Sequence, residues 1–207
     1  MSFYSRLELS NRMDSEIVSL FQKCGFIIEK SGYENFISEN TRGLLRNIHN
    51  NPTVTFLRYL PDLFAHKEGK SFFIELKVMD SPIKYQSRVD TLKGLSGHND
   101  LSTSNIGVVE TASINNYKKL TSIGVDILVI VYCTYNQKVI LAEWENNIVT
   151  FYNDVVKIGE GNASFTPYTN IHLDKMRTIK EIFLNDFKID IPQSIIDDII
   201  NDLKNIK

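Results

Sequence analysis

Apolar residues recur at helical spacing in the first part of the chain, over roughly residues 5 to 24. The positions on this stripe are Met13, Ile17, Leu20, Phe21 and Cys24. Such spacing predicts an amphipathic helix, and Gly25 directly after it is a typical helix end. "FIIEK" (26–30) then predicts a short strand, and "SENTRGLLRNIHNN" (38–51) predicts a brief helix closed by Asn-Asn-Pro.

The middle of the chain holds two runs rich in β-branched and aromatic residues. They are "TVTFLRYLPDLFA" (53–65) and "SFFIELKV" (71–78), joined by "HKEGK". Two such runs around a short polar segment with a glycine predict a β-hairpin. Residues 80 to 107 are then polar and rich in Gly, Ser, Asn and Asp. A loop that long inside a compact domain is usually functional or mobile.

The pattern then returns to regular elements. We expect a helix over about 109–122 that ends at Gly124, followed by a buried strand, "VDILVIVYC" (125–133). "KVILAEW" and "NIVTFYN" predict a second hairpin turning around residues 145–147. This order of elements indicates a mixed sheet with helices on its faces.

The C-terminal third is read as a loop and two helices. Residues 159–170 are rich in Gly, Asn, Ser and Thr and read as a loop, followed by a helix near 173–186. The last helix begins after Pro192. Its apolar stripe predicts either core packing or a partner-facing groove. The stripe consists of Ile195, Ile196, Ile199, Ile200, Leu203 and Ile206.

Composition narrows the class of protein only modestly. The chain has 207 residues, 43% of them hydrophobic, which suffices for one well-buried core. The net charge of −2 gives no global basic field for nucleic acid, although clustered carboxylates can mask a local basic surface. The longest apolar run, residues 127–133, is too short to span a bilayer. We therefore expect a soluble, cytoplasmic protein. We expect no zinc site, because the cysteines and histidines lack the spacing of zinc ligands.

The second run of the first hairpin carries charge on one of its faces. Side chains alternate along a strand, so Glu75 and Lys77 share a face with Phe73. The other face is uniformly apolar and must be the core side. We therefore expect Glu75 and Lys77 to be displayed together on the face opposite the core.

The turn of that hairpin determines where Asp62 lies. If Glu68-Gly69 forms the loop, Lys67 pairs with Lys70, and Asp62 falls directly opposite Glu75. Their Cβ atoms would then be about 4.5–5.5 Å apart. Two carboxylates so placed repel each other and require a shared proton, a nearby cation or a bound metal. Lys77 offers a partial counter-charge, and hard oxygen donors suit Mg²⁺ or Mn²⁺.

Pro61-Asp62, twelve further residues and then Glu75-Leu76-Lys77 resemble the PD-(D/E)xK signature of the restriction-endonuclease-like nucleases. That superfamily includes type II restriction enzymes and Holliday junction resolvases. The resemblance implies an α/β (α+β) fold, with a central mixed β-sheet flanked by helices and a C-terminal helical extension. It assigns residues 1–150 to the nuclease core and 151–207 to an extension packing on the core or on a partner.

The resemblance also implies an activity and its residues. The activity is Mg²⁺-dependent hydrolysis of DNA phosphodiester bonds, with Mn²⁺ able to substitute for Mg²⁺. Asp62 and Glu75 would ligate the metal with the backbone carbonyl of Leu76, and Lys77 would serve the attacking water. Family members often add a glutamate from the first helix, for which Glu16 is the best match. The helix after the motif strand often adds polar residues, here Glu110, Ser113 and Tyr117, which fall on one face.

A nuclease also needs cations around its acidic centre to bind DNA. The candidates for DNA contacts are Arg42, Arg46, Lys67, Lys70, Lys84, Lys93, Ser113 and Tyr117. Many such nucleases act on two strands as dimers, so a homodimer is expected.

Three other interpretations remain open at this point. The motif residues could form an exposed Glu-Lys ladder on a surface strand. The chain could be a nuclease-fold protein without turnover that binds nucleic acid or protein. It could also be an interaction protein that dimerises through its Ile-rich last helix.

Overall fold

The computed structural model describes most of the chain. The described residues are 3–32, 35, 37–45, 48, 51–79, 89–90, 93–94, 99, 101–135, 139–158 and 164–206, with 3, 151–158 and 164–166 described by backbone alone. The helices are α1 (Phe3–Lys23), α3 (Glu39–Leu45), α4 (Pro52–Arg58), α6 (Thr111–Ser122), α7 (Ile179–Asp186) and α8 (Gln193–Lys204). The strands are β1 (Ile27–Lys30), β2 (Leu63–Lys67), β3 (Lys70–Met79), β4 (Ile106–Glu110), β5 (Ile127–Cys133), β6 (Ile140–Trp144), β7 (Thr150–Ile158), β8 (Ser164–His172) and β9 (Arg177–Thr178).

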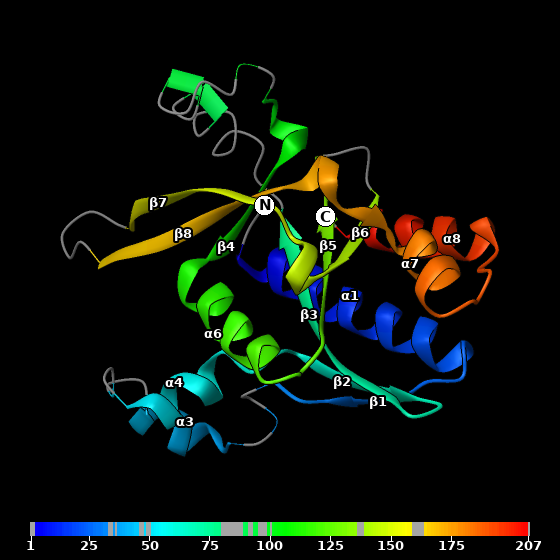
Figure 1. Ribbon diagram of the computed structural model, residues 1–207, viewed down its shortest axis with the longest axis horizontal. Helices are drawn as coiled ribbons and strands as arrows, with labels where there is room; N and C mark the ends of the chain where they lie inside the picture. The colour runs from blue at the N-terminus through cyan, green and yellow to red at the C-terminus, as the bar shows by residue number, and fades with distance from the viewer. Residues whose placement is uncertain are drawn as a thin grey trace.

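A mixed six-stranded sheet forms the centre of the molecule, in the order β1-β2-β3-β5-β6-β9. Its β3 and β5 pair in parallel, whereas the other neighbouring strands pair antiparallel. Helices α1, α7 and α8 cover one face of this sheet, and α6 lies against the other (Figure 1). The predicted central mixed sheet with flanking helices is therefore confirmed.

Both faces of the central sheet are buried, each under its own hydrophobic cluster. Strand β5 is buried at all seven positions, with Leu128, Ile130 and Tyr132 in one cluster and its other four residues in the second. Helix α6 contributes Ile114 and Leu120 to the second cluster. From the alternation of side chains, Glu75 was expected on a face of β3 that lies away from the core. That expectation was wrong, because α6 covers this face as well.

The first hairpin has the expected register. Its described pairs run from Leu63↔Ile74 to Lys67↔Lys70 around Glu68 and Gly69. Both loop residues have positive φ, 49° for Glu68 and 82° for Gly69. A two-residue loop with two positive φ angles matches the twist of the flanking strands, so this turn sets the register of the whole hairpin.

The first half of the run 53–65 is helical, so the prediction of a continuous strand there was wrong. Asn51 caps α4, because its side-chain oxygen accepts hydrogen bonds from the backbone N–H groups of Thr53 (2.9 Å) and Val54 (3.1 Å). Pro52 occupies the first turn, where its missing N–H costs nothing. The Asn-Pro pair that was read as the end of a helix instead begins one, despite the β-branched residues after it.

The second predicted hairpin was also wrong. Strand β7 does not pair with β6; it pairs with β8, and β8 pairs with β4, in a separate three-stranded sheet. The short helical turn Glu145–Asn147 redirects the chain after β6, and buried Glu145 accepts a hydrogen bond there from Thr121 of α6 (3.1 Å). Strand β8 occupies much of the segment read as a loop, 159–170.

The predicted helix over 109–122 corresponds to α6, with a later start. It begins at Thr111, because Val109 and Glu110 belong to β4. Gly124 follows the helix with a φ of 88°, as expected for a helix end. Most of the polar segment 80–107 lies outside the described residues.

The isoleucine stripe of α8 faces the core of its own chain. Ile196, Ile199, Ile200 and Leu203 are buried in the cluster that also contains the apolar stripe of α1. The guanidinium of Arg12 in α1 donates a hydrogen bond to Asp202 of α8 (2.9 Å). The interpretation of this stripe as a dimerisation surface therefore loses its basis. No helix in the described part of the chain has the length and apolar character to cross a membrane.

Phe183 of α7 tests the packing of the α1–α7–α8 layer. Its ring is 0% exposed and contacts the rings of Phe21, Phe26 and Phe187. Phe183→Ala should lower the free energy of unfolding by about 3–5 kcal/mol, through lost burial and the cavity left behind. Chemical denaturation measures this. Leu184→Ala is the matched control, because Leu184 is 46% exposed, and an equal loss in both variants would contradict the assignment.

Candidate active site

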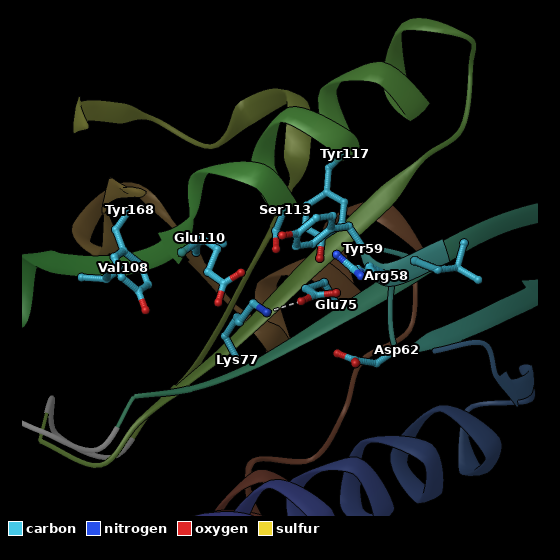
Figure 2. A pocket seen from close by; sticks show the side chains of 12 residues that line it. Arg58, Tyr59, Asp62, Glu75, Lys77, Val108, Glu110, Ser113, Tyr117 and Tyr168 are labelled. Atoms are coloured by element: carbon cyan, nitrogen blue, oxygen red, sulfur yellow. Dashed lines mark ion pairs between the residues drawn. The ribbon is translucent and has the colours of Figure 1, made fainter. Parts of the chain in front are cut away.

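A cavity of about 370 Å³ opens beside the second half of β3, between the central sheet, α6 and the second sheet. Asp62, Glu75 and Lys77 lie together in its wall, as Figure 2 shows. The other lining residues are Arg58, Tyr59, Leu60, Val108, Val109, Glu110, Ser113, Tyr117 and Tyr168. The structure thus brings the three motif side chains, two from β3 and one from the residue just before β2, into one cavity.

Asp62 is held through both its backbone and its side chain. Its carbonyl accepts hydrogen bonds from the N–H groups of Ser31 (2.8 Å) and Gly32 (3.0 Å), just after β1. Its carboxylate oxygen Oδ2 accepts a hydrogen bond from the N–H of Leu76 (2.7 Å). The described β2–β3 pairs end at Leu63↔Ile74, so the Asp62 carboxylate bonds to β3 just beyond the last of them.

The same bond orients the backbone of Leu76. In an antiparallel ladder the N–H and C=O of one residue face the same neighbouring strand. Because the N–H of Leu76 faces Asp62, its carbonyl oxygen faces the same edge of β3. A cation beside the Asp62 carboxylate would therefore find a backbone oxygen on that edge.

Glu75 is buried in the middle of β3, with 4% of its surface exposed. It forms an ion pair with the ammonium of Lys77 on the same strand. Tyr117 of α6, which is 2% exposed, also interacts with this carboxylate. A buried carboxylate requires such partners, because desolvation otherwise disfavours its charge. The exposed Glu-Lys ladder is therefore ruled out.

The pKa values of the two partners follow from this environment. Burial raises the pKa of Tyr117 well above its ordinary value, and the charge of Glu75 raises it further, so the phenol stays protonated. Burial alone would lower the pKa of Lys77, but the surrounding carboxylates outweigh burial and raise it. Glu75 contributes most, followed by Asp62 and Glu110. Lys77 is thus a cation, not a proton acceptor, at neutral pH.

Helix α6 and the second sheet form the opposite wall of the cavity. Glu110 ends β4, where it pairs with Tyr168 of β8. Ser113 and Tyr117 lie on the first two turns of α6. The three polar residues that the sequence placed on one helix face therefore line the cavity together.

Arg58, Tyr59 and Tyr168 line the cavity without having been singled out from the sequence. Arg58 is in the last turn of α4, and its guanidinium donates to the carbonyl of Leu45. The side-chain amide of Asn116 in α6 donates to the carbonyl of Tyr59 (3.1 Å), which fixes the end of α4 beside the cavity. The Asn51-Pro52 pair was the signal that could have placed Arg58 on a helix.

The remaining sequence candidates lie elsewhere or outside the described residues. Glu16 pairs with Arg12 on α1 (3.1 Å) and does not line the cavity. Lys67 and Lys70 flank the hairpin turn, and Lys67 is five residues from Asp62, about 17 Å along an extended strand. Arg42 and Lys93 are described but do not line the cavity. Arg46 and Lys84 lie outside the described residues.

The donor set at the cavity fits a hard divalent cation. Within the described residues, no three or more His, Cys, Asp or Glu side chains gather closely enough to hold a metal by themselves. Mg²⁺ is usually bound by one or two carboxylates, with waters and substrate phosphates completing its shell. Asp62 and Glu75 supply two carboxylates on one cavity, and Leu76 supplies a carbonyl on the same edge. These residues suit Mg²⁺ or Mn²⁺.

Comparison with known proteins adds little to this description. No protein-family model matches the sequence, and no curated protein matches it. A solved structure that matches is the 1.6 Å resolution structure of Archaeoglobus fulgidus Hjc, a Holliday junction resolvase from an archaeal hyperthermophile. The identity is 10% and the TM-score 0.45, over 84% of this chain and 93% of that one. At that distance the similarity carries no argument about what this chain does.

Proposed function

We propose that this protein is a Mg²⁺-dependent DNA endonuclease of the restriction-endonuclease-like class. One observation carries the proposal: Asp62, Glu75 and Lys77, spaced as in the PD-(D/E)xK signature, converge on a single cavity. Asp62 is fixed by the Leu76 N–H, and Glu75 is buried against Lys77 and Tyr117. Two carboxylates and a lysine held this way suit phosphodiester hydrolysis.

The roles of the residues follow from their positions. A divalent cation bound at the two carboxylates would polarise the phosphoryl oxygen and activate water. Asp62 and Glu75 bind that cation, and the Leu76 carbonyl lies on the same edge. The charged ammonium of Lys77 orients the nucleophile and stabilises negative charge that develops on the phosphoryl oxygens. Tyr117 restrains the Glu75 carboxylate from the side of α6.

The cavity wall also suits a nucleic-acid strand. Arg58 offers a cation for a phosphate, and half-buried Tyr59 and Tyr168 add aromatic surface from two different elements. Tyr168 belongs to residues 151–207, so we propose that this C-terminal segment completes the site as well as packing on the core. The homodimer stays a prediction, which light scattering measures.

Loss of cleavage in motif variants tests the activity. Asp62→Ala, Glu75→Ala and Lys77→Ala should each lower the rate of plasmid or branched-DNA cleavage by at least about 100-fold, because each removes cation binding or charge stabilisation. Cleavage should require Mg²⁺ or Mn²⁺. Lys204→Ala, a change at the end of α8, is the control for an unrelated lysine. Wild-type activity in the Lys77→Ala protein would contradict the mechanism.

A nuclease-fold binding module without turnover is the second candidate function. It predicts DNA or protein binding without Mn²⁺ binding, and without a metal-dependent rise in melting temperature. The presence of all three motif side chains in one cavity favours the nuclease. Titration of the wild-type protein with Mn²⁺ therefore separates the two functions.

Arg58 tests whether DNA enters this cavity. Arg58→Ala should weaken binding of short DNA in fluorescence anisotropy and reduce the slope of log K against log [salt] by about one, as expected for one lost phosphate contact. Arg58→Lys should retain most of the slope, since it keeps the charge. Lys204→Ala should leave it unchanged. A slope unaltered in Arg58→Ala would show that DNA binds elsewhere.

A further inference from the structure

Lys77 lies between two carboxylates that come from different elements. Glu75 is two residues earlier on the same strand, whereas Glu110 stands across the cavity at the junction of β4 and α6. Figure 2 shows both carboxylates directed toward the lysine side chain. The lysine pairs with Glu75. Glu110 is exposed and has no ion-pair partner among the described residues.

The pair between Lys77 and Glu75 conflicts with the proposed role of Glu75. A divalent cation at Asp62 and Glu75 would compete with the ammonium for the Glu75 carboxylate, whose Oε1 now pairs with Lys77, and its charge would repel Lys77. Lys77 must then find another acceptor or leave the cavity for water. A lysine that left the cavity would be too far away to stabilise charge at the phosphate.

We propose that Glu110 is a positioning residue that takes over Lys77 from Glu75 when a divalent cation binds. This inference rests on the proposed function and adds a residue to its site. Backbone pairing with Tyr168 and the start of α6 fix the place of Glu110. The lysine has a flexible four-carbon stem and can move between the two acceptors while its backbone stays in β3.

The exposure of Glu110 suits this role. A solvated carboxylate accepts the ammonium without first losing a buried partner, unlike Glu75, which is enclosed by Lys77 and Tyr117. The exchange would leave Glu75 free to ligate the cation while Lys77 stays inside the cavity. Glu110 would therefore favour cation binding through the lysine, without being a ligand itself.

A double-mutant cycle tests this coupling. Mn²⁺ affinity is measured by titration calorimetry for the wild type, Glu110→Gln, Lys77→Met and the double variant. Glu110→Gln should raise the Mn²⁺ Kd about tenfold, the size typical of residues that support a ligand. In the Lys77→Met background, the same change should alter the Mn²⁺ Kd by less than about twofold, because the ammonium that Glu110 would bind is absent.

The other outcomes contradict the inference. Equal effects in both backgrounds would mean that Glu110 acts on the cation directly, and no effect in either would remove its role. Asp198→Asn removes one exposed negative charge from α8. If it lowered the Mn²⁺ affinity as much as Glu110→Gln does, the effect would be due to net charge. Melting temperatures without metal exclude unfolding of a variant. Absence of Mn²⁺ binding by the wild type would overturn the proposed nuclease too, whereas binding without coupling overturns only this inference.

Discussion

The burial of Glu75 is the constraint on which the candidate site depends. A carboxylate at the centre of a covered sheet is unfavourable unless nearby groups stabilise its charge. Lys77 supplies the counter-charge and Tyr117 a second polar group beside the carboxylate, so a strand residue and a helix residue must both be in place. The buried carboxylate is therefore stabilised only while α6 packs against the central sheet.

The site lies where two sheets and two helices meet. The parallel pairing of β3 with β5 requires a crossover, and α6 is part of it and covers one face of the sheet. Strands β4 and β8 then bring Glu110 and Tyr168 against the same cavity. Asn116 ties α6 to the end of α4, which places Arg58 there. Segments far apart in the chain thus converge on two carboxylates.

Local patterns predicted the first hairpin correctly but mistook its neighbours. The turn Glu68-Gly69 fixed the register because positive φ at both positions is a local property of the backbone. The run 53–65 is not a continuous strand, because the Asn51-Pro52 helix start prevails over the strand preference of its β-branched residues. Strand β7 was misassigned because alternation specifies a strand and not its partner, which here is β8.

The sequence by itself determined the motif residues, their spacing and the register of the hairpin, since these depend on alternation and turn chemistry within about twenty residues. Only the tertiary structure decided that Glu75 is enclosed, that Tyr117 holds it, and that Glu110 and Arg58 share its cavity. The reason is physical: whether a strand face meets solvent or a helix depends on contacts between distant segments. A single strand's pattern cannot distinguish an exposed charged face from a covered one that pairs its charges.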